Sequence, residues 1–232
     1  MTFARTSTFT ALQEVHATNE QFKAHFTELH ATHYMFCSPS ANSAAAGGVA
    51  TCVNMLLLPL GATVSFDSIV PGRALATTVI HNSRCSHHLN LHNAELLHHE
   101  TKLVCDWLSS KAVLAAKLPQ DHSVIATGDW NFEAEGNAST SMKDLSKVTL
   151  QHSATNAGAL VRALRLYTEM ATIEDTHFNK AELVTSNLDR TFVACPGSLL
   201  LNLKKTSLYW TTQLHFMPLG SLITLLPTSA SL

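Results

Sequence analysis

The chain has 232 residues, of which 46% are hydrophobic and 14% are charged, and its formal net charge is −2. This composition predicts a folded protein with a substantial core and excludes an intrinsically disordered chain. The small negative charge excludes the overall basic character of many nucleic-acid-binding domains, although a local field in a cleft stays compatible with a nucleic-acid substrate.

Cysteine usage and the apolar segments indicate the cellular setting. Five cysteines, at positions 37, 52, 85, 105 and 195, are scattered and form no CxxC pair, a pattern that favours reduced thiols over disulfides or structural zinc. The first fifteen residues lack a continuous apolar segment, and the longest apolar runs contain Pro and Gly and are too short for a bilayer. We therefore expect a soluble intracellular protein, nuclear or cytoplasmic, without a membrane partner.

The N-terminal half predicts mainly strands. Residues 9–15 are typical of a strand, and residues 17–31 of an amphipathic helix with one apolar face. Three segments, GGVATCVNML (47–56), ATVSFDSIV (62–70) and ALATTVIHN (74–82), predict successive strands of a hairpin run. SHHLNLHN (86–93) alternates in polarity like a further strand. The Arg of the PGR turn, Arg73, is expected to be a hairpin-turn charge, and contact with a phosphate is the alternative.

The C-terminal half predicts helices between strands. Residues 94–116 carry a helical apolar stripe, a strand follows that ends at Gly128, and a second helix is expected over about 155–171. Residues 181–195 contain another strand. Strands interrupted by helices predict an α/β (α+β) fold, a two-layer β-sandwich flanked by helices. No linker or internal repeat divides the chain, so we expect residues 1–232 to form a single domain.

Four polar residues stand at strand ends or inside an apolar strand. In VIATGDWNF (124–132), Asp129 and Asn131 are two apart and share a face in extended chain, either as a capping turn or as half of an active site. Glu14 ends the first strand, where it is a helix-start carboxylate or a metal ligand. Asp189 lies in an apolar strand, where its partner is Arg190, a Lys or a functional group. Together these oxygen ligands favour a hard cation such as Mg²⁺.

The histidines offer a competing metal site. His87, His88, His92, His98 and His99 cluster in the sequence, but no Cys or carboxylate completes a standard zinc spacing. We expect solvent-facing or helix-packing imidazoles rather than a zinc centre.

The segments LQEVH, PGRAL, NLHN, GDWNF and LDRTFVA resemble, in this order and at these intervals, the endonuclease/exonuclease/phosphatase superfamily. Its members include abasic-site endonucleases, retroelement endonucleases, deadenylases and inositol polyphosphate phosphatases. The likeness covers about residues 9 to 200, and the PGRAL and NLHN segments are most similar to the retroelement type. It implies divalent-metal-dependent hydrolysis of phosphodiester bonds in nucleic acid, in DNA rather than RNA.

The resemblance also implies roles for individual residues. Glu14 would bind Mg²⁺ or Mn²⁺, Asp129 would orient or deprotonate the attacking water, and Asn131 would contact the phosphate as charge builds up. Asp189 would hold a catalytic His in its productive tautomer. His92 and Asn93 fall near the strand end with which the superfamily contacts the phosphate, so they are candidate substrate-binding residues.

Two expected pieces of the superfamily pattern are absent. An upstream strand with a metal-supporting Asn does not fit in the 13 residues before Glu14, and no Ser-Asp-His triplet occurs anywhere, with residues from about 205 to 232 forming an atypical tail. Two alternatives therefore stay open: a catalytically inactive relic that only binds phosphate or nucleic acid, and a phosphomonoesterase of inositol-phosphate type. One permitted choice of codons for Leu219–Pro227 spells Gly-Leu-Ser-Asp-His-Ala-Pro-Ala in a shifted frame, so we expect a frame slip upstream of Leu219.

Overall fold

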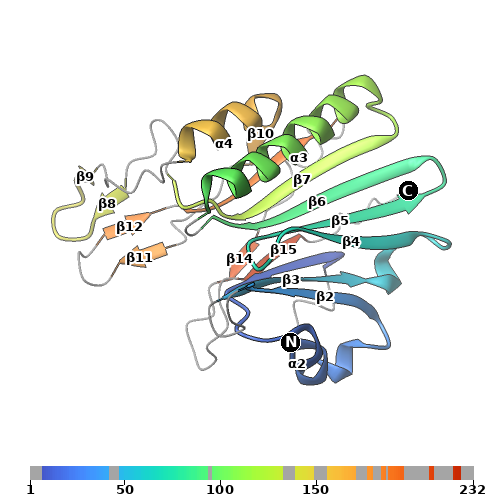
Figure 1. Ribbon diagram of the computed structural model, residues 1–232. Coiled ribbons are helices and arrows are strands. Elements are labelled where there is room, and N and C mark those ends of the chain that lie inside the picture. Colours follow the sequence, from blue (N-terminus) through green and yellow to red (C-terminus); the bar gives the residue numbers. More distant parts are fainter. Residues whose placement is uncertain are drawn as a thin grey trace.

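The computed structural model describes residues 7–41, 47–93, 96–132, 139–148, 156–170, 177–179, 184–186, 188–195, 209–211 and 222–225. Two β-sheets pack face to face, with helix α2 outside one sheet and helices α3 and α4 outside the other (Figure 1). This arrangement confirms the two-layer sandwich flanked by helices that the sequence predicts.

The first sheet is antiparallel, and its strand order is β14-β15-β1-β3-β2. Its strands are β1 (Phe9–Gln13), β2 (His33–Pro39), β3 (Gly48–Asn54), β14 (Tyr209–Thr211) and β15 (Leu222–Leu225). Strand β1 lies between β3 and β15, so the backbone of the C-terminal tail takes part in this sheet. Strand β2 was not predicted from the sequence; its segment HYMFCSP alternates only partly in burial.

Helix α2 (Asn19–His25) covers the outer face of the first sheet. It begins with a capping box, in which Thr18 and Gln21 exchange side-chain and backbone hydrogen bonds. The observed helix is shorter than the one predicted over residues 17–31, because the backbone leaves helical geometry at Phe26 and continues as a 3-10 turn, η1 (Thr27–Leu29). Phe22 and Leu29 are buried and hold this segment on the sheet.

The second sheet has the order β10-β13-β7-β6-β5-β4. Its strands are β4 (Thr63–Val70), β5 (Ala74–His81), β6 (Arg84–His92), β7 (His122–Asp129), β10 (Thr168–Met170) and β13 (Asp189–Ala194). Strands β6 and β7 are parallel and are connected through α3 (His98–Lys117), whereas the other described strand pairs of this sheet are antiparallel. The expected hairpin between residues 47–56 and 62–70 is wrong, because β3 and β4 belong to different sheets and are separated by a 3-10 turn, η3 (Met55–Leu57).

Helices α3 and α4 (Ala157–Ala163) bury the outer face of the second sheet. Leu89, Leu91, Leu108 and Trp130 are fully buried in this core. The predicted helix over 155–171 is too long: α4 is followed by a 3-10 turn, η4 (Leu164–Leu166), and then by β10. The reason is tertiary, since residues 168–170 pair with β13 at the edge of the sheet.

A third, small sheet has the order β11-β12-β8-β9 and lies beside the sandwich (Figure 1). Its strands are β8 (Ser139–Ser141), β9 (Lys147–Val148), β11 (His177–Asn179) and β12 (Val184–Ser186).

All five cysteines are free thiols, as the sequence predicts, and burial raises the pKa of Cys37 and Cys52 to about 12. Among the described helices, none combines the length and the apolar character needed to cross a membrane.

Candidate active site

Glu14 follows directly on the central strand of the first sheet and has an unusual backbone. Its φ is +52°, in the left-handed region that residues with a Cβ rarely adopt. The next amide, Val15 N, donates to Gly48 O at 3.0 Å and ties this turn to β3. The Glu14 side chain is 56% exposed, so its carboxylate is presented to solvent at the end of the strand.

Gly128 brings strands β6 and β7 unusually close at the same end of the sandwich. Its φ is +148°, and a Cβ at this position would lie 1.8 Å from Leu91 O and 2.7 Å from Gln13 Nε2. The first contact is with backbone, which cannot move aside, so the position requires glycine. The next residue, Asp129, is thereby held against the end of β6.

The segment from Asp129 to Asn131 forms a tight turn. Asn131 N donates to Asp129 Oδ1 at 2.9 Å, and Asn131 has φ +50°, a conformation that Asn tolerates better than most residues. Trp130 between them is fully buried, and its indole Nε1 donates to Arg190 O at 2.9 Å. The capping turn considered from the sequence is therefore real, and it coexists with a partly exposed Asp129 carboxylate.

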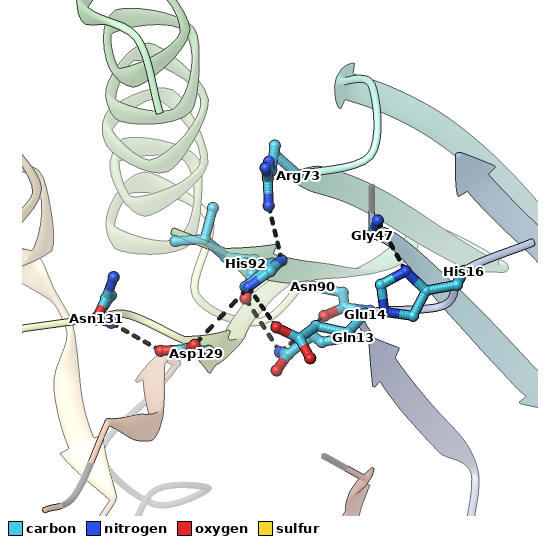
Figure 2. Close-up of polar contacts among 10 residues, drawn as sticks. Gln13, Glu14, His16, Gly47, Arg73, Asn90, His92, Asp129 and Asn131 are labelled. Carbon is cyan, nitrogen blue, oxygen red and sulfur yellow. Dashed lines mark hydrogen bonds and ion pairs between the residues drawn. The ribbon is translucent and has the colours of Figure 1, made fainter. Parts of the chain in front are cut away.

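His92 brings the two halves of the site together. Its Nε2 lies 3.6 Å from Glu14 Oε1 and 3.9 Å from Asp129 Oδ2, while Asn131 is bonded to Asp129 (Figure 2). Glu14 comes from the first sheet, and His92 and Asp129 come from adjacent strands of the second sheet. The imidazole is 5% exposed and the Asp129 side chain 28% exposed, so the cluster lies at the surface but is anchored in the core.

Arg73 lies in the hairpin turn between β4 and β5, as expected, and it also contacts this cluster. Arg73 Nη1 donates to His92 Nδ1 at 3.1 Å, on the side of the ring opposite the carboxylates (Figure 2). Val70–Arg73 form a turn closed by Arg73 N donating to Val70 O at 3.0 Å, with Pro71 second and Gly72 third at φ +71°. Pro followed by Gly at these positions is the signature of a type II turn, which is the sequence signal for this placement.

A buried amide network joins the two sheets beneath the site. Gln13 Nε2 donates to Asn90 Oδ1 at 3.2 Å and to Leu91 O at 3.0 Å, and Asn90 Nδ2 donates to Leu12 O and Ala50 O at 3.0 and 2.9 Å. Both side chains are nearly fully buried. Asn90 was missed as a site-supporting residue, although an Asn between two Leu of an alternating strand was the available sequence signal.

Asn93 and Asp189 lie at the same end of the second sheet. Asn93 is 1% exposed; its Nδ2 donates to Trp130 O and its Oδ1 accepts from Asn156 Nδ2 at 2.8 Å. Its amide is thus engaged in holding the Trp130 turn. Asp189 is buried and is the cross-strand neighbour of Asp129. The alternative partner considered for it, Arg190, forms a two-pronged ion pair with Glu169 at 2.6 and 2.7 Å.

The donor set fits an open Mg²⁺ site better than a closed metal centre. No three His, Cys, Asp or Glu side chains of the described residues are grouped as a ready metal cage. Mg²⁺ usually takes one or two carboxylates and completes its shell with water and phosphate oxygens. The exposed Glu14 carboxylate, with Asp129 nearby, offers this chemistry. Gln13 Oε1, one residue before Glu14, is a buried acceptor without a partner among the described atoms, which is compatible with an ordered ligand there.

Of the remaining histidines of the cluster, His87 and His88 are buried, and His98 and His99 are exposed. His88 stacks on Phe9 with ring centroids 3.5 Å apart, and burial lowers its pKa to about 3. His87 Nε2 lies 3.2 Å from His122 Nδ1, and burial, with a contribution from Lys111, lowers the pKa of His87 to about 4. His98 begins α3, followed by His99. The exposed His98 and His99 are solvent-facing, as expected, whereas His88 is buried against Phe9 of the first sheet and is neither solvent-facing nor packed on a helix.

Comparison with known proteins identifies the fold. No family model and no curated protein match the sequence. Among solved structures, the chain is similar to the AP endonuclease LMAP from Leishmania major, with a TM-score of 0.61, 11% identity and coverage of 94% of this chain and 78% of that one. It is also similar to the endonuclease domain of TRAS1, a telomere-specific non-LTR retrotransposon, with a TM-score of 0.51, 12% identity and coverage of 91% and 92%.

An AP endonuclease from Archaeoglobus fulgidus has a TM-score of 0.50, 16% identity and coverage of 89% of this chain and 82% of that one. These neighbours have the endonuclease/exonuclease/phosphatase fold, and the two-layer sandwich of the chain is consistent with it. At these identities the likeness shows the fold alone, and the chemistry has to be argued from the site.

Proposed function

We propose that this chain hydrolyses phosphodiester bonds in nucleic acid, with DNA as the preferred substrate and Mg²⁺ or Mn²⁺ as the cofactor. The observation that carries the proposal is the convergence of Glu14, His92 and Asp129 at one end of the sandwich, with Asn131 bonded to Asp129. Within this class we propose an endonuclease of retroelement type, supported by the sequence resemblance and by the similarity to the TRAS1 domain.

Each residue has a distinct task in this reaction. Asp129 orients the attacking water and accepts its proton, a role for which a partly exposed carboxylate is suited. Asn131 donates its side-chain amide to a phosphate oxygen as negative charge accumulates, while its backbone stays fixed by Asp129. His92, whose side chain is almost fully buried beside Glu14 and Asp129, contacts the phosphate.

Glu14 would hold the Mg²⁺ ion, which supplies charge neutralisation at the phosphate oxygens. Asp189 lies in register beside Asp129, where it would orient an additional catalytic group. Asn93 acts in this scheme as a positioning residue, because its side-chain amide already holds Trp130 O and Asn156.

A plasmid-nicking assay with and without Mg²⁺ tests the proposal. Asp129→Ala and Asn131→Ala should each lower the nicking rate by about a hundredfold or more, the usual effect of losing one aligned group in such a site. Asp67→Ala, which removes an exposed carboxylate from β4, is the matched control and should nick at the wild-type rate. Nicking that persists in EDTA or in both site variants would reject the proposed site.

A non-catalytic binder is the second candidate, because no Ser-Asp-His triplet occurs in the 232 residues. Fluorescence anisotropy with a labelled DNA duplex in Mg²⁺ separates the two: binding without nicking supports the relic. Release of inorganic phosphate from a soluble inositol phosphate, measured in parallel, would instead identify a phosphomonoesterase.

A further inference from the structure

Arg73 and His92 are joined by two hydrogen bonds, one between backbones and one between side chains. His92 N donates to Arg73 O at 2.8 Å, and Arg73 Nη1 meets His92 Nδ1 at 3.1 Å. The turn that carries Arg73 is itself anchored on the first sheet: Gly72 N donates to Ser38 Oγ at 3.1 Å, and a Cβ at Gly72 would lie 2.4 Å from Ser40 Cα. The fold therefore fixes the backbone of Arg73 beside His92, and the side-chain hydrogen bond places the guanidinium at the Nδ1 edge of the ring.

The chemistry of arginine decides which ring nitrogen of His92 carries the proton. A guanidinium has five N–H donors and no acceptor, so the nitrogen that it meets has to be unprotonated. In the neutral ring the hydrogen is then on Nε2, the nitrogen that faces Glu14 and Asp129 at 3.6 and 3.9 Å. A second-sphere hydrogen bond of this kind is the usual means by which a protein selects a histidine tautomer.

We propose that Arg73 is a positioning residue that fixes His92 as the Nε2–H tautomer, so that His92 serves the reacting phosphate as a hydrogen-bond donor. An Nε2–H nitrogen has no lone pair for a proton or a metal, so His92 is neither the general base nor a metal ligand in this arrangement. A neutral imidazole can stabilise developing oxyanion charge as a donor. The role of the tautomer in catalysis rests on the function proposed above, whereas the tautomer itself does not.

The competing role for Arg73 is direct binding of a phosphate. Among the described residues, no carboxylate forms an ion pair with it, so its remaining donors are available to an anion. The two roles make opposite demands on a substitution. Direct binding needs the positive charge, whereas the tautomer lock needs only a donor to Nδ1.

Nitrogen-15 NMR of the His92 imidazole tests the tautomer without any substrate. In the wild-type chain we expect an unprotonated Nδ1 and a protonated Nε2. Arg73→Gln retains a donor and should keep this pattern, whereas Arg73→Glu presents an acceptor and should move the hydrogen to Nδ1. A protonated Nδ1 in the wild type, or a pattern that Arg73→Glu leaves unchanged, would overturn the assignment even if the chain cleaves nothing.

Steady-state nicking kinetics then separate positioning from direct binding. For positioning, Arg73→Gln should retain kcat within about tenfold, and Arg73→Glu should lower kcat by about a hundredfold, the cost of one misdirected donor. In a His92→Gln background, whose amide offers a donor without an Nδ1 acceptor, Arg73→Gln should have less than a threefold additional effect on kcat. If Arg73 instead binds the phosphate directly, Arg73→Lys would be the only one of these Arg73 variants to retain activity. Arg73→Gln would then raise KM in both the wild-type and the His92→Gln background. That result rejects the proposal.

Discussion

Glu14 adopts a conformation that glutamate rarely adopts, and this conformation places its carboxylate beside His92. A left-handed backbone costs a residue with a Cβ roughly 1–2 kcal/mol, and the cost persists only where the surrounding structure imposes it. Here the turn that contains Glu14 is tied to β3 by the bond from Val15 N to Gly48 O. Backbone strain at an exposed carboxylate is compatible with the metal-binding role proposed for Glu14.

Glu14→Asn should therefore separate stability from activity. Asn tolerates the left-handed region, so we expect the free energy of unfolding to stay equal or to rise by up to about 1 kcal/mol. Nicking should fall by about a hundredfold, because the carboxylate that would hold the metal is lost. Urea denaturation and the plasmid assay measure the two effects.

Leu145→Asn is the matched control for this prediction, since Leu145 is exposed and has φ +57°. It should give a similar gain in stability and leave nicking unchanged. A marked loss of stability in Glu14→Asn alone would show that the Glu14 carboxylate holds the fold together, which contradicts the assignment.

Gly128 requires glycine for a steric reason that the sequence only partly reveals. Gly128→Ala should lower the free energy of unfolding by more than about 3 kcal/mol or prevent folding, since its Cβ would overlap Leu91 O at 1.8 Å. Gly61→Ala is the control: Gly61 has φ +83° but nothing within 4 Å of a Cβ, so only the backbone cost of about 1 kcal/mol applies. Equal losses in the two variants, measured by urea denaturation, would refute the steric account.

Strand β6 carries two buried histidines that make the free energy of unfolding of the protein depend on pH. Burial lowers the pKa of His87 to about 4 and that of His88 to about 3, while both return to about 6.5 in the unfolded chain. Below pH 6.5 the unfolded state therefore binds more protons than the native state. Stability should be complete above pH 6.5 and fall as the pH drops toward 4, by up to about 1.4 kcal/mol per pH unit for each histidine.

Urea denaturation between pH 4 and pH 8 measures this slope. His88→Gln should reduce the slope by the share of one group, whereas His99→Gln, which removes an exposed histidine from α3, should leave it unchanged. Parallel curves for the wild type and His88→Gln would mean that His88 does not carry the effect.

The elements were predictable from the sequence where local pattern and tertiary role agree. The strand within residues 86–93 and the helix within residues 94–116 are examples, although Leu103 and Val113 of the expected apolar stripe are exposed. The prediction failed where pairing partners decide, as for residues 168–170, which follow α4 but pair with β13. Short motifs singled out Glu14, Asp129 and Asn131, which the fold brings close together, and their catalytic roles stay predictions. The sequence did not reveal that Arg73 contacts His92, because that contact depends on the register in which β5 pairs with β6.

The whole molecule includes a tail whose backbone pairs with β1. Residues 222–225 form β15 opposite Phe9–Leu12, where the shifted frame would encode Asp-His. Sequencing the locus tests the frame slip: the bases from the end of the Leu222 codon to the middle of the Thr224 codon should read GAT CAC. Any other reading there rejects it. If the bases agree, a chain expressed in the shifted frame should nick DNA at least about a hundredfold faster than this one, because a donor to developing charge is restored.

Because β7 pairs with β13, a strand that supports the candidate site is synthesised well after the side chains of the site. Glu14, Arg73, His92 and Asp129 have all been synthesised by residue 129, but the strand that flanks β7 opposite β6 begins 60 residues later, at Asp189 (189 − 129). Arg190 of that strand also supplies the carbonyl that holds Trp130. A translation product that stops within this interval carries these four side chains but lacks the strand that fixes Asp129 in place.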